Sequence, residues 1–139
     1  MKYDEFLKLE NQKKKPKRKP RHLESEVQKA CVRYFRLKYP NYIVLSVPNG
    51  GSRNALEAAN LKREGALAGV SDLIVIAERA VLFVEMKYGK NRQSEKQKQF
   101  QQAVERLGHT YVVCYGLQDF MLIIERWLKE KLGVYDTQI

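Results

Sequence analysis

Apolar side chains recur every three or four residues in several stretches of the chain, and this spacing predicts amphipathic helices. The first should run from about Ser25 to Lys38, where Ser25 and Gln28 have the spacing of a capping box. A short helix is expected over 55–66, which is rich in strong helix formers. Ser94 and Gln97 form a second capping-box pattern before another helix, and a final helix should pass through residues 120–128.

Runs of apolar and β-branched residues predict four strands between these helices. They lie at 42–47, 73–77, 81–86 and 111–115. Only residues 78–80 separate the middle two, which suits a hairpin, and we expect both strands to be buried on both faces because they are apolar throughout. The predicted fold class is α/β, with a small mixed sheet flanked by helices.

The charge of the chain indicates a polyanionic partner. The 139 residues include 26 Lys or Arg and 16 Asp or Glu, for a net charge of +10, and 44% of them are hydrophobic, which is enough for one compact core. Nine of the basic and three of the acidic residues lie in the first 23 positions, so this segment carries +6 of the total. Nucleic acid is therefore the first partner to consider.

We interpret residues 1–23 as a basic, flexible arm and residues 24–139 as the domain. The arm is either a solvated disordered segment or a sequence-independent phosphate-binding one, and the prolines within it argue against a helix on a membrane surface. Its candidate DNA-binding residues are Lys13, Lys14, Lys15, Lys17 and Arg18.

Other classes of protein fit the sequence poorly. No segment has the roughly 20 apolar residues that span a bilayer, and the N-terminus lacks a secretory signal, so we expect a cytoplasmic protein without a membrane partner. Cys31 and Cys114 lack metal-ligand spacing and are expected to pack as small apolar residues.

The candidate chemistry lies at one end of the predicted hairpin. Antiparallel pairing should place Asp72 across from Glu85 or Met86, while Glu85 and Lys87 share a face of their strand. Two carboxylates beside an ammonium could hold Mg²⁺, or Mn²⁺, and act on a phosphate. On spacing alone, an ordinary surface salt bridge is the better explanation of these residues.

Five short motifs, taken in order, resemble the virus-type replication-repair nuclease (VRR-NUC) branch of the PD-(D/E)xK nuclease superfamily. They are Glu24–Gln28, Pro48–Gly51, Gly69–Leu73, Val84–Lys87 and Ser94–Gln97. The resemblance covers roughly residues 24–118 and implies a restriction-endonuclease-like fold. Ser71 stands where the superfamily has proline, but that position is not a ligand.

The resemblance also implies roles for individual residues. Asp72, Glu85 and the Met86 carbonyl would bind the metal, and Lys87 would be the catalytic lysine. The family's helix glutamate and its glutamine after the lysine correspond to Glu26 and Gln97.

Both of those last assignments have an alternative. An acid in the first turn of a helix is favoured by the helix dipole, and Glu24 lies two residues from Glu26. Gln97 is equally well explained as the capping-box partner of Ser94.

Four further residues are candidate phosphate contacts. Asn49 lies in a glycine-rich loop and Arg53 follows it, but that loop is equally well explained as a turn. Lys90 and Arg92 follow the catalytic strand, where a solvated basic surface would give the same pattern.

The expected function is Mg²⁺-dependent hydrolysis of phosphodiester bonds in DNA. The resemblance implies a branched substrate such as a four-way junction, which a homodimer could cut symmetrically. The alternatives are a sequence-specific restriction-type endonuclease, a DNA-binding module of the same fold that does not cleave, and a basic RNA-binding protein, for which no RNA-module motif is present.

Overall fold

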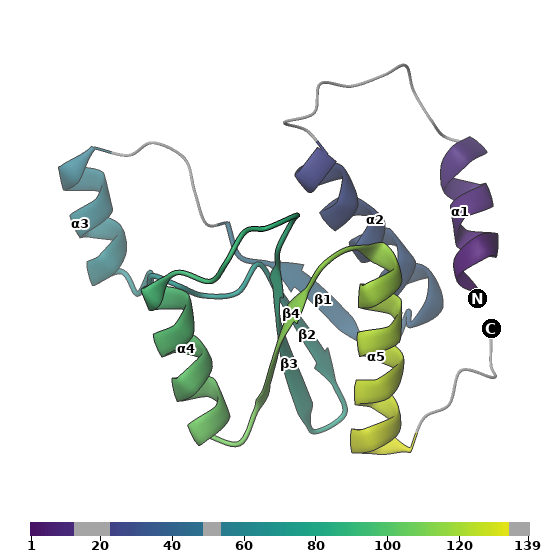
Figure 1. The fold of residues 1–139 in the computed structure, drawn as a ribbon. Coiled ribbons are helices and arrows are strands. Elements are labelled where there is room, and N and C mark those ends of the chain that lie inside the picture. The colour runs from purple at the N-terminus through teal and green to yellow at the C-terminus, as the bar shows by residue number, and fades with distance from the viewer. Residues whose placement is uncertain (13–22, 49–53, 134–139) are drawn as a thin grey trace.

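The computed structural model describes residues 1–12, 23–48 and 54–133. The elements in chain order are α1 (Tyr3–Gln12), α2 (Leu23–Lys38), β1 (Ile43–Ser46), α3 (Ala55–Arg63), β2 (Leu73–Ala77), β3 (Ala80–Met86), α4 (Glu95–Arg106), β4 (Thr110–Cys114) and α5 (Leu117–Leu132). The predicted α/β class, with a mixed sheet flanked by helices, is confirmed (Figure 1).

The sheet has the order β1-β2-β3-β4, in which the first three strands are antiparallel and β4 is parallel to β3. The parallel pair needs a crossover, which α4 provides. The β2–β3 turn is tighter than predicted, because Ala77 pairs with Ala80 and only Glu78 and Arg79 lie between the strands. Arg79, the second of these two residues, takes a left-handed φ of 56°, the conformation that a type II turn needs at that position.

The two faces of the sheet are covered differently. On one face, Leu73, Val75 and Val84 pack with residues of α2 and α5 in the main core. On the other face, Phe83 meets Phe100 of α4 and the rings are 5.4 Å apart. In β2, buried residues alternate with partly exposed ones, and in β3 Val81 and Phe83 are also partly exposed, so the expectation that both strands are buried on both faces is wrong.

The core is built around aromatic rings from separate elements. Tyr34 of α2 meets Phe6 of α1 and Phe120 of α5 in edge-to-face contacts, at 5.7 and 6.2 Å. Cys31 and Cys114 are fully buried and unbonded to each other, as predicted, and burial raises the pKa of the Cys114 thiol to about 12.

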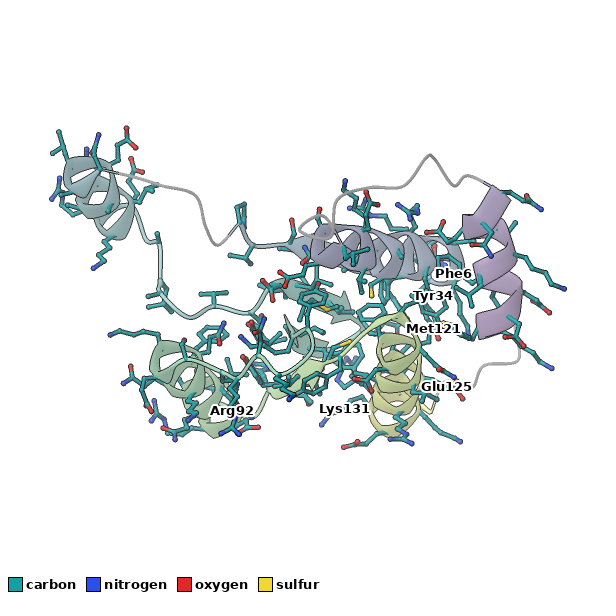
Figure 2. All side chains as sticks on the ribbon, turned by 45° about the horizontal axis from the view of Figure 1, so that its top comes forward. Phe6, Tyr34, Arg92, Met121, Glu125 and Lys131 are labelled. Atoms are coloured by element: carbon teal, nitrogen blue, oxygen red, sulfur yellow. The ribbon has the colours of Figure 1, made fainter. Side chains whose placement is uncertain are left out.

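The N-terminal helix α1 was not predicted. Residues 3–12 were expected to belong to a flexible arm, but they form a helix whose Phe6 side chain is 2% exposed against Tyr34 (Figure 2). Phe6 is the one buried residue of this helix, and the charged residues around it leave no clear amphipathic pattern in the sequence. The five candidate cations of the arm, Lys13 to Arg18, lie outside the described residues.

Several element boundaries differ from the prediction. Because α2 begins at Leu23, Ser25 lies inside the helix and the predicted capping box with Gln28 is wrong. The capping box of Ser94 and Gln97 is confirmed. Helix α3 ends three residues early and stands away from the sheet, with no buried residue (Figure 1). In the described part of the chain, no helix is both long and apolar enough to cross a membrane.

Candidate active site

Asp72 and Glu85 meet at one end of the β2–β3 hairpin, as the sequence predicted. Leu73 pairs with Val84, so the residue before β2 lies opposite Glu85. The Met86 amide donates a hydrogen bond of 2.8 Å to Asp72 Oδ2. This bond fixes the Asp72 carboxylate against β3, beside the carboxylate of Glu85.

Glu85 is a buried acid with one unsatisfied oxygen. Its side chain accepts a 2.8 Å hydrogen bond at Oε2 from Gln97 Nε2, and the residue is 2% exposed. The other oxygen, Oε1, is buried and has no hydrogen-bond partner among the described residues. Burial and the nearby Asp72 charge raise the pKa of Glu85 to about 7, and the Lys87 ammonium opposes this rise.

Lys87 is held beside the acidic pair rather than in solvent. Its Nζ lies 3.5 Å from Glu85 Oε2 and donates a 2.9 Å hydrogen bond to Gln97 Oε1. The side chain is 12% exposed. The interpretation of Glu85 and Lys87 as a surface salt bridge is therefore wrong, because both groups are withdrawn from water.

Gln97 belongs to the helix cap and to the site at the same time. Its Oε1 accepts from the Ser94 amide at 2.8 Å as well as from Lys87, while its Nε2 donates to Glu85. The capping-box explanation is therefore confirmed, and the same side chain also contacts Glu85 and Lys87. The first turn of α4 positions the amide that orients Glu85 and Lys87.

Gly69 allows α4 to approach the site so closely, and sequence reasoning gave it no separate role. It has a φ of +86°, and a Cβ added there would lie 2.3 Å from the Lys96 carbonyl oxygen and 2.9 Å from the Gln97 amide nitrogen. Any side chain at this position would push away the turn that carries Gln97. The available signal was the glycine that begins the motif Gly69–Leu73.

Helix α2 lines the cavity of the acidic pair with Glu24 and not with Glu26. This cavity has a volume of about 760 Å³ and is also lined by Asp72 and Glu85. Near its start, α2 contributes Glu24, Ser25 and Gln28 to the lining. The Tyr88 hydroxyl donates a 2.8 Å hydrogen bond to the Glu24 carbonyl and ties the end of β3 to this turn. Glu26 does not line the cavity, and its carboxylate lies 3.8 Å from Lys29 Nζ.

The acidic pair suits a hard cation such as Mg²⁺ or Mn²⁺. The unpartnered Glu85 Oε1 and the adjacent Asp72 carboxylate could supply oxygen ligands, and Mg²⁺ commonly keeps several waters beside one or two carboxylates. In the described residues, no three His, Cys, Asp or Glu side chains gather closely enough to form a complete protein cage. The expected set of Glu26, Asp72 and Glu85 is therefore not brought together.

The remaining candidates occupy different places. Met86 buries its side chain in the core, at 4% exposed, and its amide holds Asp72. Lys90 and Arg92 are exposed near the cavity, which Asn91 between them lines; Figure 2 shows Arg92 beside α4. Asn49 and Arg53 lie outside the described residues.

Comparisons with known proteins agree on one family. A family model for the VRR-NUC domain matches residues 11–118. A solved structure described as a "VRR_NUC domain protein" is 25% identical, with a TM-score of 0.64 over 84% of this chain and 96% of the other. Another, described as a "VRR_NUC domain", is 22% identical with a TM-score of 0.55 over 75% and 96%, which shows the fold. No curated protein matches the sequence significantly.

Proposed function

Because the chain belongs to the VRR-NUC domain family, we propose that it hydrolyses phosphodiester bonds in DNA with a divalent cation held by Asp72 and Glu85. The family match means that residues 11–118 form a nuclease-type domain. The observation that carries the proposal is Glu85, a buried carboxylate with an unsatisfied oxygen beside a second carboxylate and an ammonium. Burying such a group costs folding free energy, and groups of this kind are concentrated at functional sites.

Each side chain of the site has a distinct role in this proposal. Asp72 and Glu85, with the Met86 carbonyl, would hold Mg²⁺ or Mn²⁺. When bound, the cation would polarise the phosphoryl group and lower the pKa of a water molecule. Lys87 Nζ, fixed by Gln97 at 2.9 Å, donates to the phosphate oxygens as negative charge builds there. From α2, Glu24 would contribute rather than Glu26, because Glu24 lines the cavity and Glu26 does not.

For the substrate, we propose branched DNA such as a four-way junction. The net charge of +10 supports a DNA partner in general but does not distinguish one DNA structure from another. A homodimer with two symmetric sites would suit a symmetric junction. A restriction-type endonuclease and a DNA-binding module that does not cleave are the alternatives.

The test compares labelled four-way, flap, nicked, linear duplex and single-stranded DNA at matched concentrations. We expect cleavage with Mg²⁺ or Mn²⁺, none with EDTA, and the highest rate on the four-way junction. Equal rates on all structures would overturn the branched substrate. Binding without cleavage under every cation condition would overturn the nuclease and favour the DNA-binding module.

A further inference from the structure

The cavity that contains the acidic pair continues along α2, and three cations line that part of it. Lys29, Arg33 and Arg36 line the same cavity as Asp72 and Glu85. Sequence reasoning assigned none of them a role, because basic residues on a helix usually form a solvated face. We call these three residues the α2 row.

The spacing of the α2 row suits a nucleic-acid strand. Residues at i, i+4 and i+7 lie on one face of a helix, and seven residues span about 10 Å. One strand of a B-form duplex presents about three phosphates over the same length. The row therefore offers one cation for each phosphate along that stretch.

One member of the row, Arg33, is held in place by α1, while Lys29 lies 3.8 Å from Glu26 on α2 itself. Arg33 donates from Nε to both carboxylate oxygens of Glu10, at 3.0 Å each, and its Nη2 contacts Glu10 Oε1. The Glu10 side chain is only 16% exposed, whereas Arg33 keeps 44% of its own exposed. Such a two-point pair orients the guanidinium while leaving part of it free for a second anion.

Charge is distributed unevenly along the cavity. The acids Glu24, Asp72 and Glu85 line the cavity together with the Lys87 ammonium, and the start of α2 is hydrogen-bonded to Tyr88, just after β3. Lys29, Arg33 and Arg36 follow farther along α2. A phosphodiester chain would be repelled from the acidic end unless a cation were bound there, and attracted along the rest.

We propose that the α2 row binds the phosphates that adjoin the scissile phosphate on the same DNA strand. The placement of the scissile phosphate at Asp72 and Glu85 rests on the proposed function; the binding of DNA by the row does not. The row would set the register of the strand, so that one particular phosphate reaches the acidic pair.

The first experiment measures DNA binding as a function of salt. Lys29→Gln, Arg33→Gln and Arg36→Gln are combined in an Asp72→Asn background, and a fluorescein-labelled duplex is titrated by anisotropy between low and physiological salt. Each lost contact should make the slope of log K against log salt less negative by about 0.9. The slope of the triple variant should therefore be less negative by about 2.7. Lys131→Gln is the matched control: it is 39% exposed on α5 and does not line the cavity.

A triple variant with the slope of the Lys131→Gln control would overturn the proposal. Thermal unfolding of all the variants shows whether the fold is intact, and single substitutions replace the triple variant if it is not. The test separates the two proposals, because binding is read in a background that cannot cleave. If the slope falls but the wild-type protein never cleaves DNA with Mg²⁺ or Mn²⁺, the row stands and the nuclease proposal fails.

The second experiment locates the row on the DNA. Once the wild-type cleavage position is mapped, three consecutive neutral methylphosphonate linkages are placed next to it on the cleaved strand. They should weaken binding by the Asp72→Asn protein but have little further effect on the triple variant, because the two changes remove the same contacts. Equal, additive losses in both proteins would place the row elsewhere on the DNA and overturn the proposed register.

Discussion

At the scale of single residues, the site depends on one buried acid that the rest of the protein leaves unsatisfied. Glu85 receives one hydrogen bond from Gln97 and lies 3.5 Å from Lys87, while its second oxygen has no partner among the described residues. An ordinary core would replace such a group with an apolar side chain. The metal-free protein should therefore carry a measurable cost at this position.

That cost should depend on pH. The pKa of Glu85 is raised from 4.5 to about 7 in the folded protein. Between these two pH values, the folded state therefore holds a proton on Glu85 that the unfolded state has lost. Stability without metal should therefore fall as pH rises from about 4.5 to about 7, by at most about 3 kcal/mol, and then level off. Glu85→Gln should abolish this fall in urea denaturation curves. An unchanged pH dependence in the variant would contradict the account.

Gln97 can be separated from the helix cap to which it belongs. Ser94→Ala breaks the cap alone and should cost about 1 kcal/mol of stability with little loss of cleavage. Gln97→Ala also frees Glu85 and Lys87, so it should reduce cleavage by roughly 10-fold to 100-fold at a similar cost in stability. Unfolding curves and single-turnover rates measure both. Equal cleavage rates in the two variants would show that Gln97 only caps the helix.

The sequence predicted the central residues but not their full set of partners. Asp72, Glu85 and Lys87 could be found because charges rarely end apolar strands, and their motifs are ordered. The choice between Glu24 and Glu26 could not be made, since both are acids in the first turn and the start of α2 was misplaced by two residues. Only the direction of the helix face shows which of them borders the cavity.

At the scale of elements, the strands were easier to predict than the contacts between elements. Hydrophobic runs gave β2 correctly and β3 to within one residue, and their register followed from the turn. The close approach of α4 to the β2 loop has no periodicity in the sequence. It depends on Gly69, whose missing side chain leaves room for the backbone of the first turn of α4.

Gly69→Ala should therefore damage both the fold and the site. The added methyl would overlap the Lys96 carbonyl at 2.3 Å, and the left-handed φ adds strain, so we expect a loss of more than about 2 kcal/mol of stability. Gly65→Ala is the matched control, because Gly65 also has a positive φ, of 112°, but nothing lies within 4 Å of the added methyl. Chemical denaturation compares them. Equal losses would mean that backbone strain, and not close packing, explains the requirement for Gly69.

At the scale of the whole molecule, the fold places the acidic pair and a series of basic residues along the same cavity. The mixed sheet brings β3 and α4 to one end, α2 closes the cavity, and basic residues extend along α2 from the acidic pair. The net charge could be counted from the sequence, whereas the arrangement of the basic residues along the cavity could be seen only in the folded structure. The burial of α1 against α2 was also not visible, because one apolar residue, Phe6, carries most of it.

The role of the basic arm can be tested without disturbing α1. Deleting the first 20 residues would remove Phe6 from the core, so Lys13, Lys14, Lys15, Lys17 and Arg18 should instead be changed together to Gln. We expect weaker DNA binding and a flatter salt dependence, measured by anisotropy, with no change in thermal stability. A salt slope equal to that of the wild-type protein would show that the arm is only a solvated segment.

The central claim is that Asp72, Glu85 and Lys87 form a cation-dependent site that cuts DNA. The most direct measurement is the single-turnover cleavage rate of a labelled four-way junction with Mg²⁺, at saturating protein. Asp72→Asn should lower the rate by roughly a thousandfold or more while DNA binding persists, because several kcal/mol of charge stabilisation are lost. Glu130→Gln, at an acid on α5 whose side chain is 74% exposed, should cleave at the wild-type rate. Equal rates for the two variants would contradict the claim.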